Sequence, residues 1–437
     1  MSTVAEVSLW GDRVGALLFN PDTGLTTFEY FNDWVHKGVS ISPIHLPARA
    51  GKFTFNTLSR ETFFGLPGVF ADTLPDDFGN AVIDAWLARN GIDKASFSPV
   101  DRLLYTGVRG MGALEYQPSS RNSQSQTSGD IHIDHLVELA QAVLDQRAGL
   151  NVQLSNRDEN QDAMSEIFQV GTSAGGARPK AVIALNRDRS RVLSGQAEIP
   201  SGFTHYLIKF DGVRERASSS EIFGDPLGFG RMEYAYYLMA KAAGINMAPS
   251  ELLLEGDRAH FLTQRFDRKG NRKRHYQSLC AMDHADFRRP GQYSYEELLT
   301  VARELRLPRE DAIEIFRRMV FNVVARNQDD HTKNFGFLMD TASAGWRLAP
   351  AFDVAYSYKP GSYWVDTHQM TINGKRDHFT RQDLLVVAKS IGRFGPGAQE
   401  VIDQVIHAVS HWGRFAQEAR VDPVLASEIQ SNLRLSI

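Results

Sequence analysis

The sequence predicts an α+β protein in which a strand-rich half precedes a larger, mostly helical half. Apolar segments separated by turn residues fill residues 4–30 and recur between residues 180 and 266, a pattern typical of strands. From about residue 276 onward, apolar residues recur at helical spacing, which indicates amphipathic helices. Three segments, residues 1–130, 131–275 and 276–437, follow from these patterns.

Composition excludes several classes of protein. The 437 residues, 42% hydrophobic and 23% charged, are typical of a globular chain with a large core. A net charge of -4 offers no basic surface for nucleic acid, so any role on DNA requires a basic partner. The single cysteine, Cys280, excludes an internal disulfide and is expected to be buried. Without a signal peptide or a long apolar run, we expect a cytoplasmic protein with no membrane partner.

The first segment, residues 1–130, is predicted to be a mixed α/β subdomain. The turn signals GD and NPDTG divide residues 4–30 into a small antiparallel meander. Residues 74–90 have a proline and acids ahead of apolar positions at helical spacing, and Asn90-Gly91 is the stop signal. The polar, Ser- and Gln-rich residues 117–130 are expected to connect this subdomain to the next.

The second segment, residues 131–275, is predicted to be a small lobe built on a sheet. An amphipathic helix opens it, and a later inserted helix ends near Gly244. Strands are expected at residues 180–185, 205–210, 250–255 and 260–266. The basic run DRKGNRKRH, residues 267–275, is expected to be a turn that is charged because it faces water.

The third segment, residues 276–437, is predicted to be a helical large lobe that carries an unusual polar cluster. A helix over residues 308–327 starts with a proline and acids, and the segment ARNQDDHTKNFGF, residues 325–337, begins where it ends. Farther on, Asp353 stands among apolar neighbours in AFDVAYSY. A carboxylate in such a setting requires a partner or a cation.

Phosphoryl transfer uses this pattern of residues. Kinases place an asparagine that holds magnesium five residues after the aspartate that accepts the substrate's proton, and a second metal-binding aspartate follows. Asp329 and Asn334 have this spacing, and Asp353 follows 19 residues later. The cluster therefore favours a kinase-type catalytic loop.

A kinase also needs a strand lysine on the nucleotide phosphates and a helix glutamate that orients it. Lys209 lies in a predicted strand and Glu233 in the inserted helix that follows. The alternative for Lys209 is an ordinary lysine at a strand edge that faces water.

A glycine-rich segment, Val170 to Leu185, is the candidate phosphate-facing loop. Ser173, Gly175 and Gly176 would let backbone N–H groups approach an anion, and Lys180 adds positive charge. The segment is neither a Walker A motif nor the kinase GxGxxG motif. The alternative is a tight loop before a strand.

Taken together, GTSAGGARPK, FADTLPDDFGN, NQDDHTKN and LAPAFDV resemble the HipA-type serine/threonine kinases, the toxins of bacterial toxin–antitoxin pairs. The resemblance implies a two-lobed protein-kinase-like fold that uses ATP and Mg²⁺ to phosphorylate a protein. It also implies a small helix-turn-helix, HipB-like antitoxin that binds operator DNA, and a substrate such as an aminoacyl-tRNA synthetase, whose modification arrests growth.

The resemblance also implies a role for individual residues. Asp329 would be the catalytic base, Asn334 and Asp353 the metal ligands, and Lys209 the nucleotide lysine, whereas Ser173 would be a regulatory autophosphorylation site. The site would also include His331, which contacts the nucleotide or braces the loop, and Lys333, which steadies the phosphate or faces solvent. Asp330 is expected to point away from its neighbour's target, and His284 and His368 are expected to be structural.

Two other functions fit parts of the sequence. Residues 171–175 match GxSxG, with Asp329 and His331 following in the order of a serine hydrolase. Gly175, Gly176 and Pro179 oppose the helix that this motif needs directly after its serine. The third possibility is a noncatalytic, kinase-shaped scaffold that binds an antitoxin. It is disfavoured because none of the expected base or metal positions is replaced.

Overall fold

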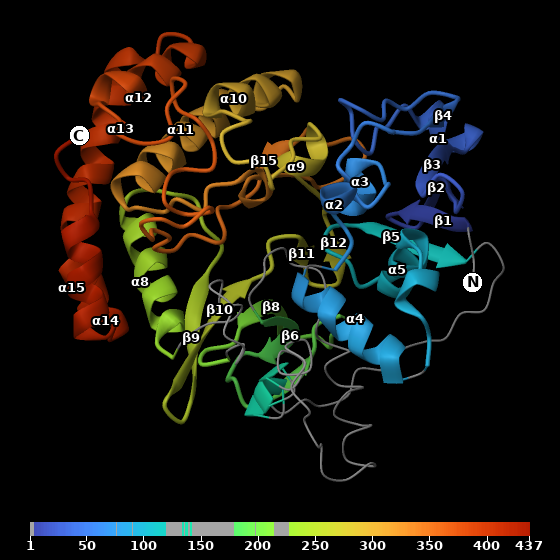
Figure 1. Ribbon diagram of the computed structural model, residues 1–437, viewed down its shortest axis with the longest axis horizontal. Coiled ribbons are helices and arrows are strands. Elements are labelled where there is room, and N and C mark those ends of the chain that lie inside the picture. Colours follow the sequence, from blue (N-terminus) through green and yellow to red (C-terminus); the bar gives the residue numbers. More distant parts are fainter. Residues whose placement is uncertain are drawn as a thin grey trace. The chain divides into compact units, whose positions relative to one another are not determined.

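The computed structural model describes residues 4–118 except 76 and 90, 133–141 except 135 and 139, 179–213 except 197, and 227–437. The chain forms two compact units (Figure 1). Unit 1 contains residues 1–40, 48–230 and 250–275, and unit 2 contains residues 41–47, 231–249 and 276–437. Helices and antiparallel sheets are both present, as the predicted α+β class requires. The three-segment division stays a prediction.

The N-terminal sheet of unit 1 begins with the predicted meander. Strands β1 (Val4–Leu9), β2 (Asp12–Asn20) and β3 (Leu25–Tyr30) pair antiparallel in sequence order. Strands β4 (Lys52–Phe53) and β5 (Leu114–Pro118) close the two edges. The helices of this part are α1 (Asn32–Lys37), α2 (Arg60–Phe63), α3 (Gly68–Ala71), α4 (Asp77–Arg89) and α5 (Pro99–Thr106).

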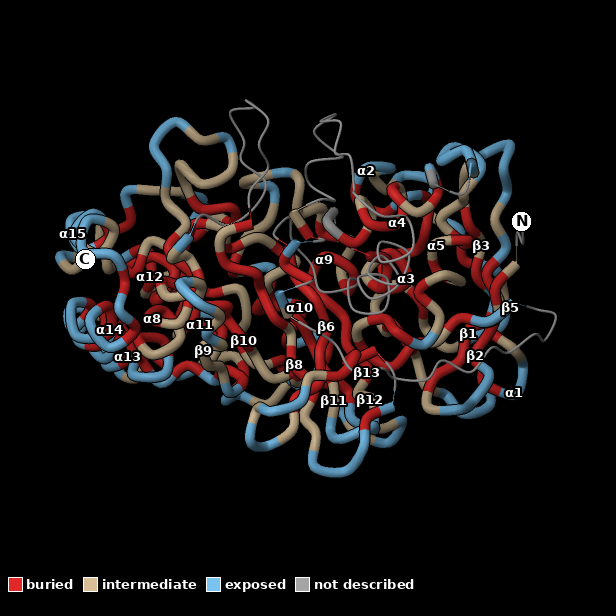
Figure 2. The backbone as a smooth tube through the Cα atoms, turned by 90° about the horizontal axis from the view of Figure 1, so that it is seen from below, coloured by how far each residue is buried: buried red, intermediate tan, exposed pale blue. Residues whose placement is uncertain are grey.

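The second sheet of unit 1 has the order β7-β6-β8-β10-β9. Its strands are β6 (Lys180–Asn186), β7 (Val192–Ser194), β8 (Phe203–Lys209), β9 (Ser250–Glu255) and β10 (Arg258–Gln264). The four strands predicted from the sequence are therefore confirmed within two residues at each end. Nearly all of β6 is buried (Figure 2), because side chains cover both faces of this sheet.

Helices cover one face of the second sheet. Alternate residues of β6, among them Ala181, Ile183 and Leu185, share an apolar cluster with Val82 of α4. The cluster also contains Leu136, Val137 and Ala140 of the segment 133–141. Since strand side chains alternate between the two faces, Lys180 and Val182 belong to the other face.

The basic run at residues 267–275 is not a solvated turn, contrary to the expectation. Asp267 is fully buried and accepts hydrogen bonds from Arg265 Nε at 2.9 Å, Arg268 Nη1 at 2.6 Å and the backbone N–H of Gly112 at 2.8 Å. Arg268 also donates to the carbonyl of Gly110 at 2.9 Å. Only residues 269–272, at the tip of the hairpin formed by β11 (Arg268–Lys269) and β12 (Arg272–Lys273), are exposed. Local composition could not reveal the burial of the rest, because Gly110 and Gly112 lie far away along the chain.

Unit 2 is mostly helical, as predicted. Its helices are α8 (Phe229–Ala242), which starts at the boundary between the units, α9 (Leu279–Met282), α10 (Tyr295–Glu304), α11 (Arg309–Val324), α12 (Arg381–Ala388), α13 (Gly395–Ser410), α14 (Trp412–Ala419) and α15 (Pro423–Asn432). A small sheet contains β13 (His275–Ser278), β14 (Gly336–Met339) and β15 (Arg347–Leu348). Cys280 is buried in α9 and forms no disulfide.

Aromatic packing holds α8 beside α11 and α14. The Tyr236 ring lies 5.3 Å from that of Trp412 and 6.3 Å from that of Phe321, between ring centroids. Its hydroxyl donates to the carbonyl of Ala325, just beyond α11, at 2.7 Å. All three rings are fully buried, so the end of α11 is fixed by the core of the unit.

A short N-terminal segment, residues 41–47, belongs to unit 2 although its chain neighbours belong to unit 1. The Ser42 hydroxyl accepts a hydrogen bond from Gln277 Nε2 at 3.0 Å. The ring of His45 stacks on that of His284, with centroids 4.0 Å apart and an interplanar angle of 4°. Unit 2 is therefore completed by residues made early in the chain.

Asp267→Asn should destabilise the protein by about 3–5 kcal/mol, because it leaves two buried guanidinium groups without their counter-ion. Burial alone would raise the pKa of Asp267, but Arg265 and Arg268 lower it well below the ordinary value. A depressed folded-state pKa stabilises the fold above about pH 4, and this contribution is lost as the pH falls through the folded-state value. Urea unfolding from pH 7 to 3 should show a weaker pH dependence for the variant, and parallel curves would contradict the prediction.

Candidate active site

The polar segment predicted from the sequence leaves the end of α11 by a sharp backbone turn. Arg326 adopts a left-handed conformation with φ 56°, and the N–H of Asn327 donates to the carbonyl of Asn322 at 3.0 Å. These are features of a helix terminus in which the residue after the cap is left-handed. The turn directs the residues after 327 away from the helix axis.

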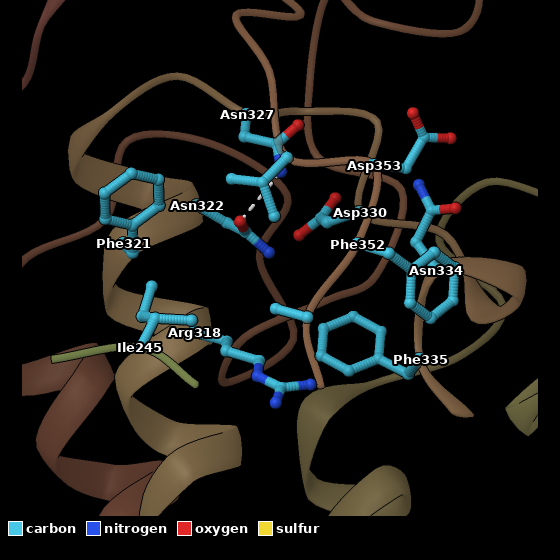
Figure 3. A pocket seen from close by; sticks show the side chains of 12 residues that line it. Ile245, Arg318, Phe321, Asn322, Asn327, Asp330, Asn334, Phe335, Phe352 and Asp353 are labelled. Carbon is cyan, nitrogen blue, oxygen red and sulfur yellow. Dashed lines mark hydrogen bonds between the residues drawn. The ribbon is translucent and has the colours of Figure 1, made fainter. Parts of the chain in front are cut away.

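A pocket in unit 2 brings together residues that are distant in sequence (Figure 3). Asn334, at the end of a short 3₁₀ helix (Thr332–Asn334), and Asp353 both line it. Figure 3 shows their polar ends on the same side of the pocket. The other lining residues are Ile245, Arg318, Phe321, Asn322, Asn327, Asp330, Phe335, Ala351, Phe352 and Val354. Six of the twelve lining residues are apolar and six are polar or charged, so the pocket gathers polar groups within an apolar frame.

Asn334 is tied to the backbone of Asp329. Its Nδ2 donates to the Asp329 carbonyl at 2.7 Å, so Oδ1 is the amide atom available to a ligand. The side chain of Asp329 is 40% exposed, and its Oδ1 lies 3.7 Å from Nε2 of His331. A carboxylate that is 40% exposed can be reached by a substrate from solvent.

Asp353 has a positive backbone φ of 55°. Aspartate enters the left-handed region more readily than most other residues with a side chain. Asp353 is partly buried, and Figure 3 shows its side chain at the same edge of the pocket as that of Asn334.

The donor set fits magnesium. Within the described ranges, no three His, Cys, Asp or Glu side chains come together as a protein-only metal site. Mg²⁺ prefers oxygen ligands and usually takes one or two carboxylates, with water and phosphate oxygens completing its shell. The amide oxygen of Asn334 and the carboxylate of Asp353 meet this requirement.

In unit 1, two buried lysines face each other across adjacent strands. Lys180 of β6 and Lys209 of β8 are paired in register, and each is 5% exposed. Lys209 lies on the middle strand of its sheet, so the alternative of a solvent-facing lysine at a strand edge is wrong. The register places both residues side by side on one face of the sheet.

The structure places the remaining predicted site residues in different surroundings. Glu233 is buried in α8, and its pairing with Lys209 stays a prediction. Lys333 Nζ lies 4.7 Å from the ring centroid of Phe287, and the His331 ring lies 5.4 Å from it. Phe287 was not singled out from the sequence because nothing in its local pattern distinguishes it. Ser173, Gly175 and Gly176 lie outside the described residues.

The carboxylate of Asp330 is buried in a hydrogen-bonding network, and Asp330 lines the same pocket as Asn334 and Asp353. Its partners are Tyr295, His368 and the backbone of Gln369. Burial alone would raise the pKa of Asp330, but His368 and these donors lower it. Sequence reasoning did not connect His368 with Asp330, because the two residues are 38 positions apart.

Comparison with protein-family models shows the family to which this chain belongs. Residues 172–412 match the HipA-like C-terminal domain, and residues 5–117 match the HipA N-terminal domain. The chain belongs to the HipA family. The predicted resemblance is thereby confirmed, together with the kinase-like α+β fold class.

A solved HipA structure shows the same fold. HipA of Shewanella oneidensis MR-1, solved with HipB and its operator DNA, is 16% identical, with 98% of this chain and 95% of that chain covered and a TM-score of 0.67. The Helicobacter pylori proinflammatory kinase CtkA is 12% identical over 53% of this chain and 88% of its own, with a TM-score of 0.34. No match was found among curated proteins. Among the described helices of this HipA-family chain, none combines the length and apolar character that crossing a membrane requires.

Asp353→Asn should weaken binding of Mg²⁺ with a non-hydrolysable ATP analogue. Ligand at about 100 times its Kd stabilises a protein by about 2.7 kcal/mol, so the wild-type melting temperature should rise clearly and that of the variant much less. Asp340→Asn, an exposed carboxylate at the end of β14, is the control and should behave as the wild type does. An equal shift in all three proteins would remove Asp353 from the metal site.

Proposed function

We propose that this protein is an ATP- and Mg²⁺-dependent serine/threonine protein kinase that acts as the toxin of a toxin–antitoxin pair. Membership of the HipA family supports the kinase-like, toxin–antitoxin assignment. The observation that carries the catalytic part is the meeting of Asn334 and Asp353 in one pocket, with Asn334 bonded to the backbone of Asp329. A kinase needs a base and two metal ligands in such an arrangement.

In the proposed reaction, the oxygen of a substrate serine or threonine attacks the γ-phosphorus of ATP. The bond between that phosphorus and the β–γ bridging oxygen breaks, ADP leaves, and the hydroxyl proton passes to Asp329. The exposure of the Asp329 carboxylate supports this role, because a base must reach the acceptor's hydroxyl.

The other residues position charge. Mg²⁺, held by Asn334 and Asp353, would neutralise the phosphate oxygens when bound. Lys209 would hold the nucleotide phosphates with Lys180 beside it, and their burial in a paired register supports this role. Glu233 would orient Lys209, while His331 and Lys333 would contact or steady the transferred phosphate. Catalysis would come from positioning and charge neutralisation more than from covalent chemistry.

The proposed partners are a HipB-like helix-turn-helix antitoxin and, through it, operator DNA. The Shewanella HipA relative, solved with HipB and operator DNA, supports this proposal, and the net charge of -4 is consistent with indirect contact to DNA. The proposed substrate is a cytoplasmic protein of translation, such as an aminoacyl-tRNA synthetase. Mass spectrometry of phosphopeptides after expression in a bacterial host would identify it.

A noncatalytic scaffold that only binds an antitoxin is the main alternative, and a GxSxG hydrolase is the weaker one. A scaffold should incorporate no phosphate from γ-labelled ATP into itself or into any protein of a cell extract. A hydrolase should be labelled at Ser173 by a fluorophosphonate probe. The kinase should give the opposite result in both experiments.

Asp329→Asn should lower the rate of phosphate transfer by roughly 10²–10⁴, the range for loss of a general base. Fold and Mg²⁺–nucleotide binding should remain, since the backbone carbonyl that holds Asn334 is unchanged. Transfer from γ-labelled ATP, measured beside a thermal-shift assay, tests this. Activity equal to that of the wild type would exclude Asp329 as the base.

Ser173→Asp should reduce nucleotide binding and transfer at least several-fold. A phosphoserine carries close to two negative charges at neutral pH, which would repel ATP from a phosphate-facing loop, and the aspartate imitates part of that charge. Ser173→Ala is the control and should retain activity while losing the autophosphorylated peptide. If Ser173→Asp binds and uses ATP as the wild type does, the proposed self-inactivation is wrong.

A further inference from the structure

A fully buried carboxylate lies next to the proposed base. The side chain of Asp330 is 0% exposed. Its Oδ2 accepts hydrogen bonds from the Tyr295 hydroxyl and from His368 Nδ1, each at 2.8 Å, and its Oδ1 accepts one from the backbone N–H of Gln369 at 2.8 Å. Three donors at this distance compensate the carboxylate for the water it has lost.

The network continues into α11. Asn322 Nδ2 donates to the Tyr295 hydroxyl at 3.0 Å, and Asn322 Oδ1 accepts from Asn327 Nδ2 at 2.9 Å. Asn322 and Asn327 also line the pocket that contains Asn334 and Asp353 (Figure 3). The start of α10, the body of α11, the loop after it and the segment at 368–369 are thus joined through one carboxylate.

His368 is buried, and the Asp330 carboxylate is its hydrogen-bond partner through the side chain. Its side chain is 0% exposed, and the ring of Phe379 packs edge-on at 5.2 Å. Its Nε2 has no hydrogen-bond partner among the described residues. Burying an imidazole with one ring nitrogen unsatisfied costs free energy, so its hydrogen bond to Asp330 has to offset that cost.

The position of Asp330 determines the geometry of the base. The Asp329 carbonyl belongs to the planar peptide unit that includes the nitrogen and Cα of Asp330. The same carbonyl accepts the hydrogen bond from Asn334 at 2.7 Å. Fixing Asp330 therefore fixes the direction of that carbonyl and, through it, the amide of Asn334. The Cα of Asp329 belongs to the same planar unit, so its position is restrained at the same time.

We propose that His368 is a positioning residue for phosphate transfer: by holding the buried Asp330 carboxylate, it sets the backbone that aims Asp329 and Asn334. This inference rests on the proposed kinase function. His368 itself touches no reacting atom, and its effect passes through Asp330 and the peptide bond to Asp329. The rate of transfer should therefore fall without a comparable loss of nucleotide affinity.

Three variants separate positioning from ordinary stabilisation. His368→Leu removes the donor and keeps an apolar side chain in the site. His368→Asn retains an amide N–H near the place of Nδ1. Asp383→Asn is the matched control, because Asp383 is also a buried carboxylate of unit 2, 5% exposed, which accepts from Lys375 Nζ and the Thr380 N–H, each at 2.8 Å. It lies outside the pocket residues.

His368→Leu should lower kcat for transfer from γ-labelled ATP by about 10–100-fold, the effect typical of losing a residue that orients a ligand. Its KM for ATP should change less than about threefold, and His368→Asn should recover most of the rate. Asp383→Asn should melt at a lower temperature yet keep kcat when assayed well below its transition. Equal kcat in His368→Leu and the wild type, or equal losses in His368→Leu and Asp383→Asn, would overturn the proposal.

Hydrogen exchange tests the positioning role of His368 independently of the kinase assignment, because the measurement does not require the protein to transfer phosphate. Backbone amides of residues 329–335 should exchange faster in His368→Leu than in Asp383→Asn, with His368→Asn close to the wild type. If the wild type transfers no phosphate but this exchange pattern holds, the proposed function fails while the positioning role stands. If exchange in this segment is the same in all the variants, the positioning role fails whatever the activity.

Discussion

Several carboxylates lie close together near the end of α11. The site depends on how far each one is buried and on which groups donate hydrogen bonds to it. Asp330 is buried and compensated by donated hydrogen bonds. Asp329, its chain neighbour, keeps 40% of its side chain in solvent. Asp353 lines the pocket from a separate segment of the chain. Adjacent residues in one loop can thus serve different purposes, because a buried carboxylate needs donors and a reactive one needs access.

The second sheet of unit 1 also buries charged side chains next to each other. Lys180 and Lys209 face each other on β6 and β8 while the opposite face of the sheet is filled by an apolar cluster. Water is largely excluded from both amines. Their burial on one face of the sheet is the observation on which the phosphate-binding role proposed for them depends.

Much of the fold and part of the site could be predicted from the sequence. The strands of the second sheet were found because their apolar residues form short runs between turn signals. The polar cluster was placed because α11 has a proline and acids at its start and apolar residues at helical spacing that end where the cluster begins. Local pattern failed where partners are remote. Asp267 looked like part of a solvated turn because Gly112 lies 155 residues away. The register that pairs Lys180 with Lys209 depends on strand alignment, which composition does not encode.

The segment at residues 41–47 has a consequence for how the protein is made. Ser42 and His45 complete a surface formed by Gln277 and His284, yet the ribosome releases them more than two hundred residues earlier. Domains of a nascent chain generally fold in order of synthesis, but here that order is broken, because the early segment must wait for its partners. A fragment that begins after residue 47 would lack a piece of unit 2, so unit 2 cannot be obtained intact by trimming the N-terminus.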